Sequence, residues 1–188
     1  QGRKYYVEFV AIDFETANRD AASACALGLA IVKDGKITAK RHWLIRPPQD
    51  YFRADFTAIH GITAAAVRNC PSFKDIWPEV RPLLEGSCLA AHNARFDRSV
   101  LQGSLEYYGL DLPAESFFVC TLELSRQTWK LPKNNLAAVA SHLDLPLQHH
   151  QAESDALACA GILLRAADYW QCASMDALID KTGLRRIF

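Results

Sequence analysis

The chain has 188 residues, of which 50% are hydrophobic and 22% charged, a composition typical of a globular domain and not of a disordered or membrane chain. Its 21 basic residues balance 21 acidic ones, so a polyanionic partner would have to be bound by a local group of positive side chains. No run approaches the roughly 18 apolar residues of a membrane-spanning helix. We expect one domain over residues 1–188 and no membrane partner, and a natural chain could continue past Phe188.

The six cysteines are scattered along the sequence, and no two of them form a CxxC pair. This spacing excludes a zinc knuckle or a dithiol redox motif. We therefore expect reduced thiols and a cytoplasmic location. The apolar N-terminal run is short, contains Glu8 and ends in acids, so no signal peptide is expected.

The N-terminal half of the sequence predicts an antiparallel meander followed by short helices. Residues 5–15 are β-branched, aromatic and apolar enough for a central strand. Two further strands follow, joined at residues 33–36, where the Asp-Gly dipeptide is a strong hairpin signal. Residues 50–63 have the composition of a loop. A short helix from about Thr63 and a helical stretch over residues 72–86 come next.

The C-terminal half alternates strands and helices. An apolar run over residues 87–93 predicts a fourth strand, which leads into a helix that Gly109 ends. Residues 117–124 begin extended and turn helical near Thr121. The remaining helices are expected over residues 134–145, with an asparagine cap, over residues 152–170, and in a short segment ending near Lys181. A meander followed by strand–helix alternation predicts an α/β sandwich around a mixed sheet.

Two carboxylates end the first predicted strand in VAIDFETAN, one residue apart. Because side chains on a strand alternate between faces, Asp13 and Glu15 must point to the same side, with Phe14 opposite. Like charges roughly 6–7 Å apart at the end of an apolar strand repel each other, and partial burial increases the repulsion. The pair therefore predicts a bound cation, most simply a metal ion.

Further titratable residues accompany this pair. Asp97 lies in HNARFD near the start of a helix, where a carboxylate also favours the positive end of the helix dipole. Asp155 lies in HHQAESDA, in the first turns of an otherwise apolar helix, so it faces either solvent or a site. His149 and His150 precede it. Each residue alone is more often a capping or surface residue, but the set together indicates a site.

Together these motifs resemble those of the DEDDh group of 3′-to-5′ exonucleases, the family of the DNA polymerase III epsilon subunit, ribonuclease T and oligoribonuclease. DFET, HNARFD and the histidine and acid of HHQAESDA occur in the family order, and IHGIT at residues 59–63 is typical of the epsilon-like branch. The resemblance implies a ribonuclease H-like fold: a mixed five-stranded sheet, an antiparallel three-stranded meander plus parallel strands, flanked by helices. The matched residues are Asp13, Glu15, Asp97, His150 and Asp155.

The resemblance also implies metal-dependent phosphodiester hydrolysis. Two divalent cations about 3.5–4 Å apart would suit it, Mg²⁺ or Mn²⁺, because hard carboxylate oxygens prefer them to zinc. In the family pattern, Asp13 bridges both ions, Glu15 and Asp155 complete the first, and Asp97 holds the second.

His150 is the general base in this pattern, since an unperturbed histidine pKa of about 6.5 suits proton transfer near neutrality. Five positions on a helix rotate by about 140°, so His150 and Asp155 would not share a helical face. We therefore expect His150 on a mobile loop before the helix. His149 is the competing candidate, although its spacing to Asp155 is one residue too long.

Substrate contacts are carried over from the family. The resemblance places Phe14 and Thr16 beside the metals, and it places Ile59, His60 and Phe96 against the terminal base or sugar. Stacking there would be worth about 1–3 kcal/mol per base. For Phe14, a role as a core aromatic is an equal alternative to substrate contact. For His60, a hydrogen bond that caps the loop is an alternative of nearly equal weight. Scattered basic residues are candidates for phosphate contacts: residues 40–42, Arg53, Arg126, Lys130 and Lys133.

We therefore expect an enzyme that releases nucleoside 5′-monophosphates from free 3′ ends, with single-stranded DNA preferred, in repair or turnover. An exoribonuclease or oligoribonuclease of the same family is the second interpretation. A catalytically inactive nucleic-acid-binding module is the third, which the five filled active-site positions disfavour. Association with a polymerase is left open, because Asn18, Ser23, Cys25 and Gly28 depart from the pattern of a dedicated proofreader.

Overall fold

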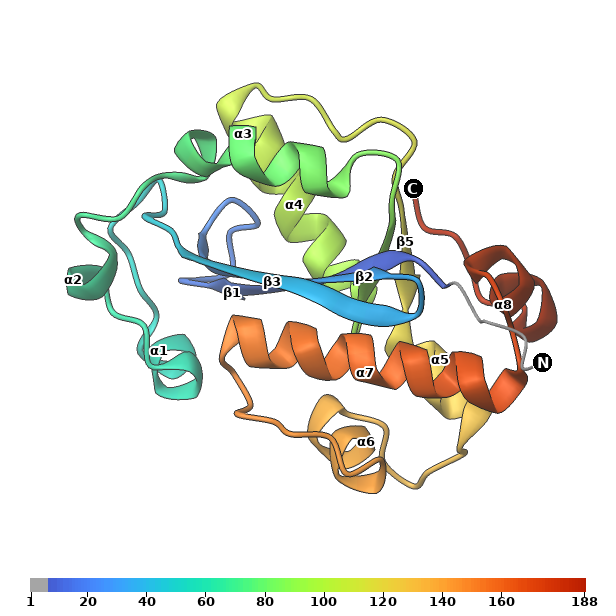
Figure 1. Ribbon diagram of the computed structural model, residues 1–188. Coiled ribbons are helices and arrows are strands. Elements are labelled where there is room, and N and C mark those ends of the chain that lie inside the picture. The colour runs from blue at the N-terminus through green and yellow to red at the C-terminus, as the bar shows by residue number, and fades with distance from the viewer. Residues whose placement is uncertain (1–6) are drawn as a thin grey trace.

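A computed structural model describes residues 7–188 (Figure 1). Its centre is one five-stranded sheet in the order β3-β2-β1-β4-β5, which confirms the predicted mixed sheet. Tyr5 and Tyr6, at the start of the first expected strand, lie outside the described residues. The strands are β1 Phe9–Thr16, β2 Ala24–Lys33, β3 Lys36–Leu44, β4 Cys88–Ala91 and β5 Phe117–Cys120.

The sheet combines an antiparallel meander with a parallel half. β1, β2 and β3 pair antiparallel, and the predicted hairpin turn has positive φ at Asp34 and Gly35. β4 pairs parallel with both β1 and β5. The β1–β4 ladder covers only Val10 with Leu89 and Ala11 with Ala90, so the two strands are unpaired beyond this point. The crevice beyond the ends of such parallel strands, where the strand order reverses, is the usual ligand position in α/β sheets.

Helices cover both faces of this sheet (Figure 1). α3 and α4 lie on one face, and α7, α5 and α6 lie on the other side. Among residues 7–188, no helix is both long and apolar enough to cross a bilayer. The helices are α1 Ala54–His60, α2 Ala64–Val67, α3 Phe73–Leu84, α4 Ala94–Tyr108, α5 Thr121–Thr128, α6 Leu136–His142, α7 Ala152–Trp170 and α8 Met175–Thr182.

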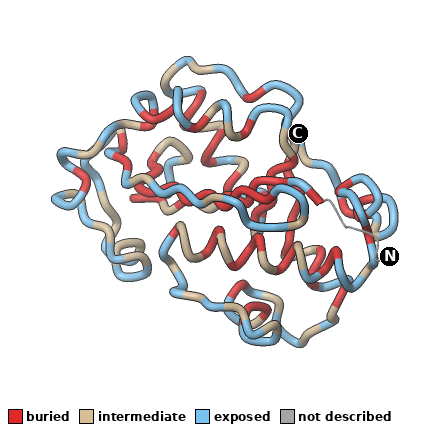
Figure 2. Tube along the Cα trace, in the orientation of Figure 1, coloured by how far each residue is buried: buried red, intermediate tan, exposed pale blue. Residues whose placement is uncertain are grey.

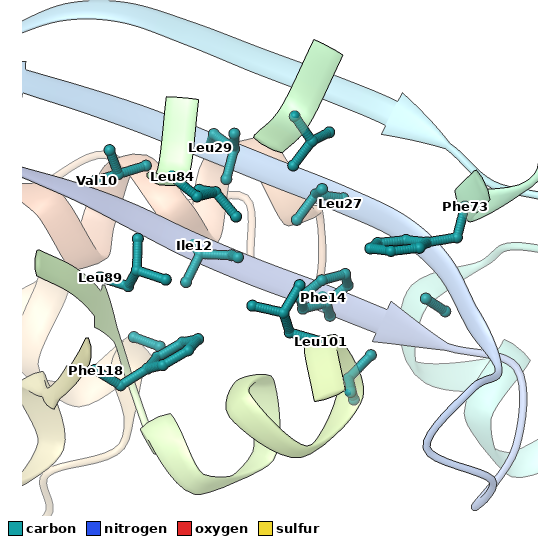
Figure 3. Packing of buried hydrophobic residues seen from close by; sticks show 14 of the residues in the cluster. Val10, Ile12, Phe14, Leu27, Leu29, Phe73, Leu84, Leu89, Leu101 and Phe118 are labelled. Carbon is teal, nitrogen blue, oxygen red and sulfur yellow. The ribbon is translucent and has the colours of Figure 1, made fainter. Parts of the chain in front are cut away.

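The core divides along the alternation of β1. Figure 3 shows Val10, Ile12 and Phe14 pointing to one side, where they pack with residues of α3 and α4 such as Leu84 and Leu101. The residues between them face α7, whose inner surface is rich in alanine. Buried residues accordingly concentrate along the sheet and the inner helix faces (Figure 2). Because Asp13 and Glu15 lie between the apolar positions, they point toward α7.

Residues 50–63 are not a simple loop, because α1 occupies Ala54–His60 within them. Gly61 ends this helix in the left-handed conformation, with φ of 75°. None of the residues of α1 is buried. The helix therefore has no core-facing apolar stripe for a sequence pattern to reveal, and the prediction of a loop-rich segment missed it.

Candidate active site

The acid pair lies at the end of β1, on the face toward α7. Asp13 and Glu15 are both half-buried. The Oδ2 atom of Asp13 is buried and has no hydrogen-bond partner among the described residues. An ionised carboxylate oxygen left in this position is unfavourable unless a cation or a donor completes it.

Asp155 approaches this pair from the first turns of α7, and it is 3% exposed. Gly28, which lies opposite Asp13 in the β1–β2 ladder, makes the approach sterically feasible. A Cβ atom on Gly28 would lie 2.2 Å from the carbonyl oxygen of Ala152. The start of α7 thus rests directly on the β2 backbone beside the acid pair.

Asp97 joins the site from the first turn of α4 and is 2% exposed. Its Oδ1 atom accepts a hydrogen bond of 2.9 Å from the backbone N–H of Phe14, which lies beyond the short β1–β4 ladder. Asn93 precedes the helix with φ of 73° and caps it without a side-chain hydrogen bond. Its backbone conformation therefore shapes the HNARFD turn.

The four acids destabilise one another as carboxylates. Burial raises the pKa of Asp13 well above its usual range, and the neighbouring Asp97 and Glu15 charges raise it further. Burial and the Asp155 charge raise the pKa of Glu15 to about 8. Burial likewise raises the pKa of Asp97 to about 8, against the Phe14 hydrogen bond, and raises that of Asp155.

This cluster fits a divalent cation. One ligand atom from each of Asp13, Glu15 and Asp155 lies within 4.8 Å of the others. Together with the unpartnered oxygen of Asp13, these atoms supply a set of hard oxygen donors with excess negative charge. Asp97 lies outside this group of three, although its charge raises the pKa of Asp13.

His149 and His150 lie in a turn before α7, and His150 has φ of 68°. Their rings stack, with centroids 3.7 Å apart. His149 Nδ1 lies 3.0 Å from Asp155 Oδ2, whereas His150 donates its backbone N–H to the same oxygen at 3.1 Å. Burial and the neighbouring His149 lower the pKa of His150. The structure thus places His150 in the predicted loop but brings the ring of His149 against the acid.

Two cavities meet at His150. The first, of about 510 Å³, is lined by the acid pair, Asp155 and both histidines, with Phe96 and Arg126 on its wall. The second, of about 310 Å³, is lined on its other side by His42, His60 and Glu153. Of the basic residues singled out in the sequence, Arg126 is therefore the one placed beside the acids. Lys40 instead pairs with Glu153 at 2.8 Å, and Arg53 pairs with Asp55 at 2.8 Å.

The expected substrate residues fall into two groups. The Phe14 ring is buried and packs 6.4 Å from the Phe73 ring centroid, which favours the core alternative. Thr16 is buried, and its carbonyl lies 2.9 Å from His60 Nε2, while His60 Nδ1 accepts from the Ile62 N–H. His60 therefore makes the loop-capping hydrogen bonds that were the alternative to substrate contact. The remaining two are exposed: Ile59 at 55% and Phe96 at 42%.

His92, the first residue of the HNARFD motif, also belongs to the site, although it was not among the residues predicted from the sequence. Its Nε2 atom lies 2.8 Å from the Asn134 carbonyl, and its Nδ1 atom lies 2.9 Å from Thr121 Oγ1. Burial lowers its pKa to about 4, so the ring is neutral. It joins the end of β4 to the start of α5 and to the 134–135 segment that lines the first cavity. The sequence feature that could have identified His92 is its position directly after the apolar run of β4.

The family is settled by comparison with known proteins. The model of the exonuclease family RNase_T matches residues 10–163. Exodeoxyribonuclease 10 of Escherichia coli is 30% identical over 185 residues, which are 94% of this chain and 77% of that protein. This chain therefore belongs to the exonuclease family, whose members are hydrolytic enzymes that use divalent metal ions. The predicted family is confirmed.

Other relatives agree with this assignment. A PolC-type DNA polymerase III of Thermotoga petrophila is 34% identical over 181 residues, and the chain spans 13% of its length. The structure titled exonuclease X in complex with 5′ overhanging duplex DNA matches with a TM-score of 0.73 and 28% identity, over 93% of this chain and 99% of that one. The nuclease domain of 3′hExo, a DEDDh family member bound to rAMP, matches with a TM-score of 0.75 over 100% of this chain and 99% of that chain. Because its sequence identity is 16%, this match shows the shared fold alone. The predicted ribonuclease H-like fold is confirmed.

Proposed function

We propose that this chain is a metal-dependent 3′-to-5′ exonuclease domain that removes nucleoside 5′-monophosphates from single-stranded DNA. The observation that carries the proposal is the convergence of four acids from three separate elements at the end of β1. Asp13 and Glu15 come from β1, Asp97 from α4 and Asp155 from α7. Burying part of this negative charge is unfavourable by itself, which indicates a function that needs it.

The acids are suited to hold Mg²⁺ or Mn²⁺. Asp13, Glu15 and Asp155 would hold one cation, and Asp97, next to Asp13, would contribute to a second. When bound, such cations supply Lewis-acid stabilisation of the charge that develops on the phosphoryl group. The hydrogen bond from the Phe14 N–H keeps Asp97 oriented before any cation arrives.

The histidine turn supplies the base. Burial and the neighbouring His149 lower the pKa of His150, which favours the neutral imidazole that can accept a proton from the attacking water. The oxygen of that water adds to phosphorus, the bond to the 3′ oxygen of the preceding nucleotide breaks, and this leaving oxygen is protonated from solvent. His149 is the competing base, because its ring faces Asp155.

The substrate is held by a small number of groups. Arg126 lies on the wall of the acidic cavity and can pair with a phosphate. Phe96 on the same wall is exposed and can stack on a base, and Ile59 offers a second exposed apolar surface. We favour DNA because two relatives that match over most of both chains at 30% and 28% identity are named exodeoxyribonuclease 10 and exonuclease X in complex with 5′ overhanging duplex DNA.

The test is digestion of matched end-labelled DNA and RNA oligonucleotides, each with a free and with a blocked 3′ end. In Mg²⁺ or Mn²⁺ we expect stepwise loss of mononucleotides from free single-stranded DNA, and no digestion with EDTA or a blocked end. Cleavage of blocked strands would reveal an endonuclease, and faster digestion of RNA would favour the exoribonuclease alternative. If the protein binds the oligonucleotides but cleaves none of them in either metal, the result would favour the catalytically inactive nucleic-acid-binding module.

Two broader expectations accompany this proposal. Residues 1–188 act as a single exonuclease domain, and it acts in the cytoplasm. The first is supported by the single sheet with helices on both faces among residues 7–188. The second rests on the six cysteines, all of which are free thiols in the structure.

A further inference from the structure

A second cluster of metal-ligand atoms adjoins the acidic site. One ligand atom from each of His149, His150 and Asp155 lies within 4.8 Å of the others. The backbone N–H of His150 also donates to Asp155 Oδ2, so the carboxylate and the histidine turn are held together. The His149 side chain is 36% exposed, so a cation can reach the cluster from solvent.

The donor chemistry of this cluster differs from that of the four acids. Two imidazoles and one carboxylate form a borderline-soft set, which suits Zn²⁺ and related transition metals better than Mg²⁺. A zinc site with three protein ligands also leaves a position open for water. Loop residues 148–151, which carry the histidines, contain no lysine or arginine, and Arg126 lies on the wall of the cavity that both histidines line.

The distances need little adjustment to admit an ion. In tetrahedral zinc sites with ligand bonds of about 2.0–2.1 Å, neighbouring ligand atoms lie roughly 3.3 Å apart. The Nδ1 atom of His149 lies 3.0 and 3.2 Å from the two oxygens of Asp155. The ring of His150 stacks on that of His149, and one of its ring nitrogens already lies within 4.8 Å of the other two ligand atoms.

We propose that His149, His150 and Asp155 form a zinc site that shares Asp155 with the acidic site and competes with the catalytic cations. Asp155 belongs to both ligand groups, so zinc at the histidines withdraws it from Asp13 and Glu15. Zinc also occupies the ring of the proposed base. Zinc binding therefore inhibits the enzyme, and this inhibition, unlike the binding itself, rests on the proposed exonuclease function.

The binding test uses the full chain and zinc alone, by titration calorimetry without nucleic acid. Wild type should bind one Zn²⁺ at this site, and His149→Gln should weaken binding by roughly tenfold or more, because one of three ligands is lost. The matched control is His142→Gln, an exposed histidine on α6, which should bind as wild type does. Thermal melts without metal establish that each variant is folded.

A second variant separates the two clusters. Asp13→Asn removes a ligand of the acidic group and none of the zinc group, so it should weaken Mn²⁺ binding and leave zinc affinity within about threefold of wild type. Equal loss of zinc affinity in Asp13→Asn and His149→Gln would place zinc among the acids and overturn the proposal. Zinc affinity that His149→Gln leaves intact would overturn it too.

Inhibition is then measured as Mg²⁺-supported digestion against rising Zn²⁺, with each variant scaled to its own zinc-free rate. The zinc concentration for half inhibition should rise about tenfold in His149→Gln and stay unchanged in His142→Gln. Zinc binding without inhibition would overturn the competition with the catalytic cations. Absence of any Mg²⁺-supported digestion would instead contradict the proposed exonuclease function, while the calorimetry would still decide the zinc site.

Discussion

Single carboxylates at this site are unfavourable for the apo fold and necessary for the proposed chemistry. Asp155 illustrates the conflict. Burial raises its pKa, although His149 and the His150 N–H both stabilise the ionised form. A residue kept in such surroundings is a better candidate for function than for stability.

Asp155→Ala should abolish cleavage because a cation ligand is lost. We expect the apo melting temperature to stay the same or rise, since the substitution removes repulsion with the other three acids. Circular dichroism melts in EDTA and oligonucleotide digestion measure the two effects. The control is Asp168→Ala, an exposed acid on the same helix, which should keep its activity. A large loss of apo stability in Asp155→Ala would identify a structural acid.

His150→Ala should lower turnover by about 10²–10⁴-fold, the usual contribution of a general base. Calorimetry should show Mn²⁺ binding largely retained, because the acids remain. His149→Ala is the matched comparison, since its ring lies next to the same acid. If His149→Ala loses turnover and His150→Ala does not, then His149 is the base.

Two elements meet closely at the site, and glycine makes this contact feasible. The start of α7 rests on β2 at Gly28, with a separation that leaves no room for a Cβ atom. Asp155 lies one turn further along the same helix. The position of the Asp155 carboxylate relative to β1 therefore depends on residue 28 being a glycine, which has no side chain.

Gly28→Ala should destabilise the protein by about 1–3 kcal/mol, because the new Cβ meets rigid backbone of Ala152. It should also reduce digestion and weaken Mn²⁺ binding, since α7 must shift and carries Asp155 with it. Urea unfolding and calorimetry measure these effects. Gly161→Ala is the control on α7, where the Cβ meets the flexible end of Leu145 and where alanine favours the helix by about 1 kcal/mol. Equal effects of both substitutions would contradict this role of Gly28.

At the scale of the whole molecule, the formal net charge is zero, while four carboxyl groups gather at the end of β1. The apo protein should therefore respond to pH through this cluster. The pKa of Glu15 rises from 4.5 to about 8 on folding, and the pKa of Asp97 rises from 3.8 to about 8. At pH values between the unfolded and the folded pKa values, the folded state therefore binds more protons than the unfolded chain.

The free energy of unfolding of the apo protein should fall as pH rises from about 5 to about 8. This stability is fully present below the unfolded pKa values and is lost as the pH passes the folded ones. Melts in EDTA across this range measure the slope, and Mg²⁺ should restore stability at the alkaline end. Glu15→Gln should reduce the slope. A melting temperature that does not change over this range in EDTA would contradict the raised pKa values.

The sequence alone determined the features that depend on local periodicity and on motif order. Strand alternation is a property of consecutive residues, so Asp13 and Glu15 could be placed on one face and the Asp-Gly hairpin could be identified. The order of DFET, HNARFD and the final histidine and acid was enough to predict the family and its fold.

The tertiary structure decided which groups meet, because such contacts join residues far apart in the chain. It placed the Phe14 ring in the core and its N–H on Asp97. It also brought His149, not the ring of His150, against Asp155, and seated α7 on Gly28. These outcomes depend on how closely two packed elements approach each other, and side-chain periodicity within one element carries no information about that distance.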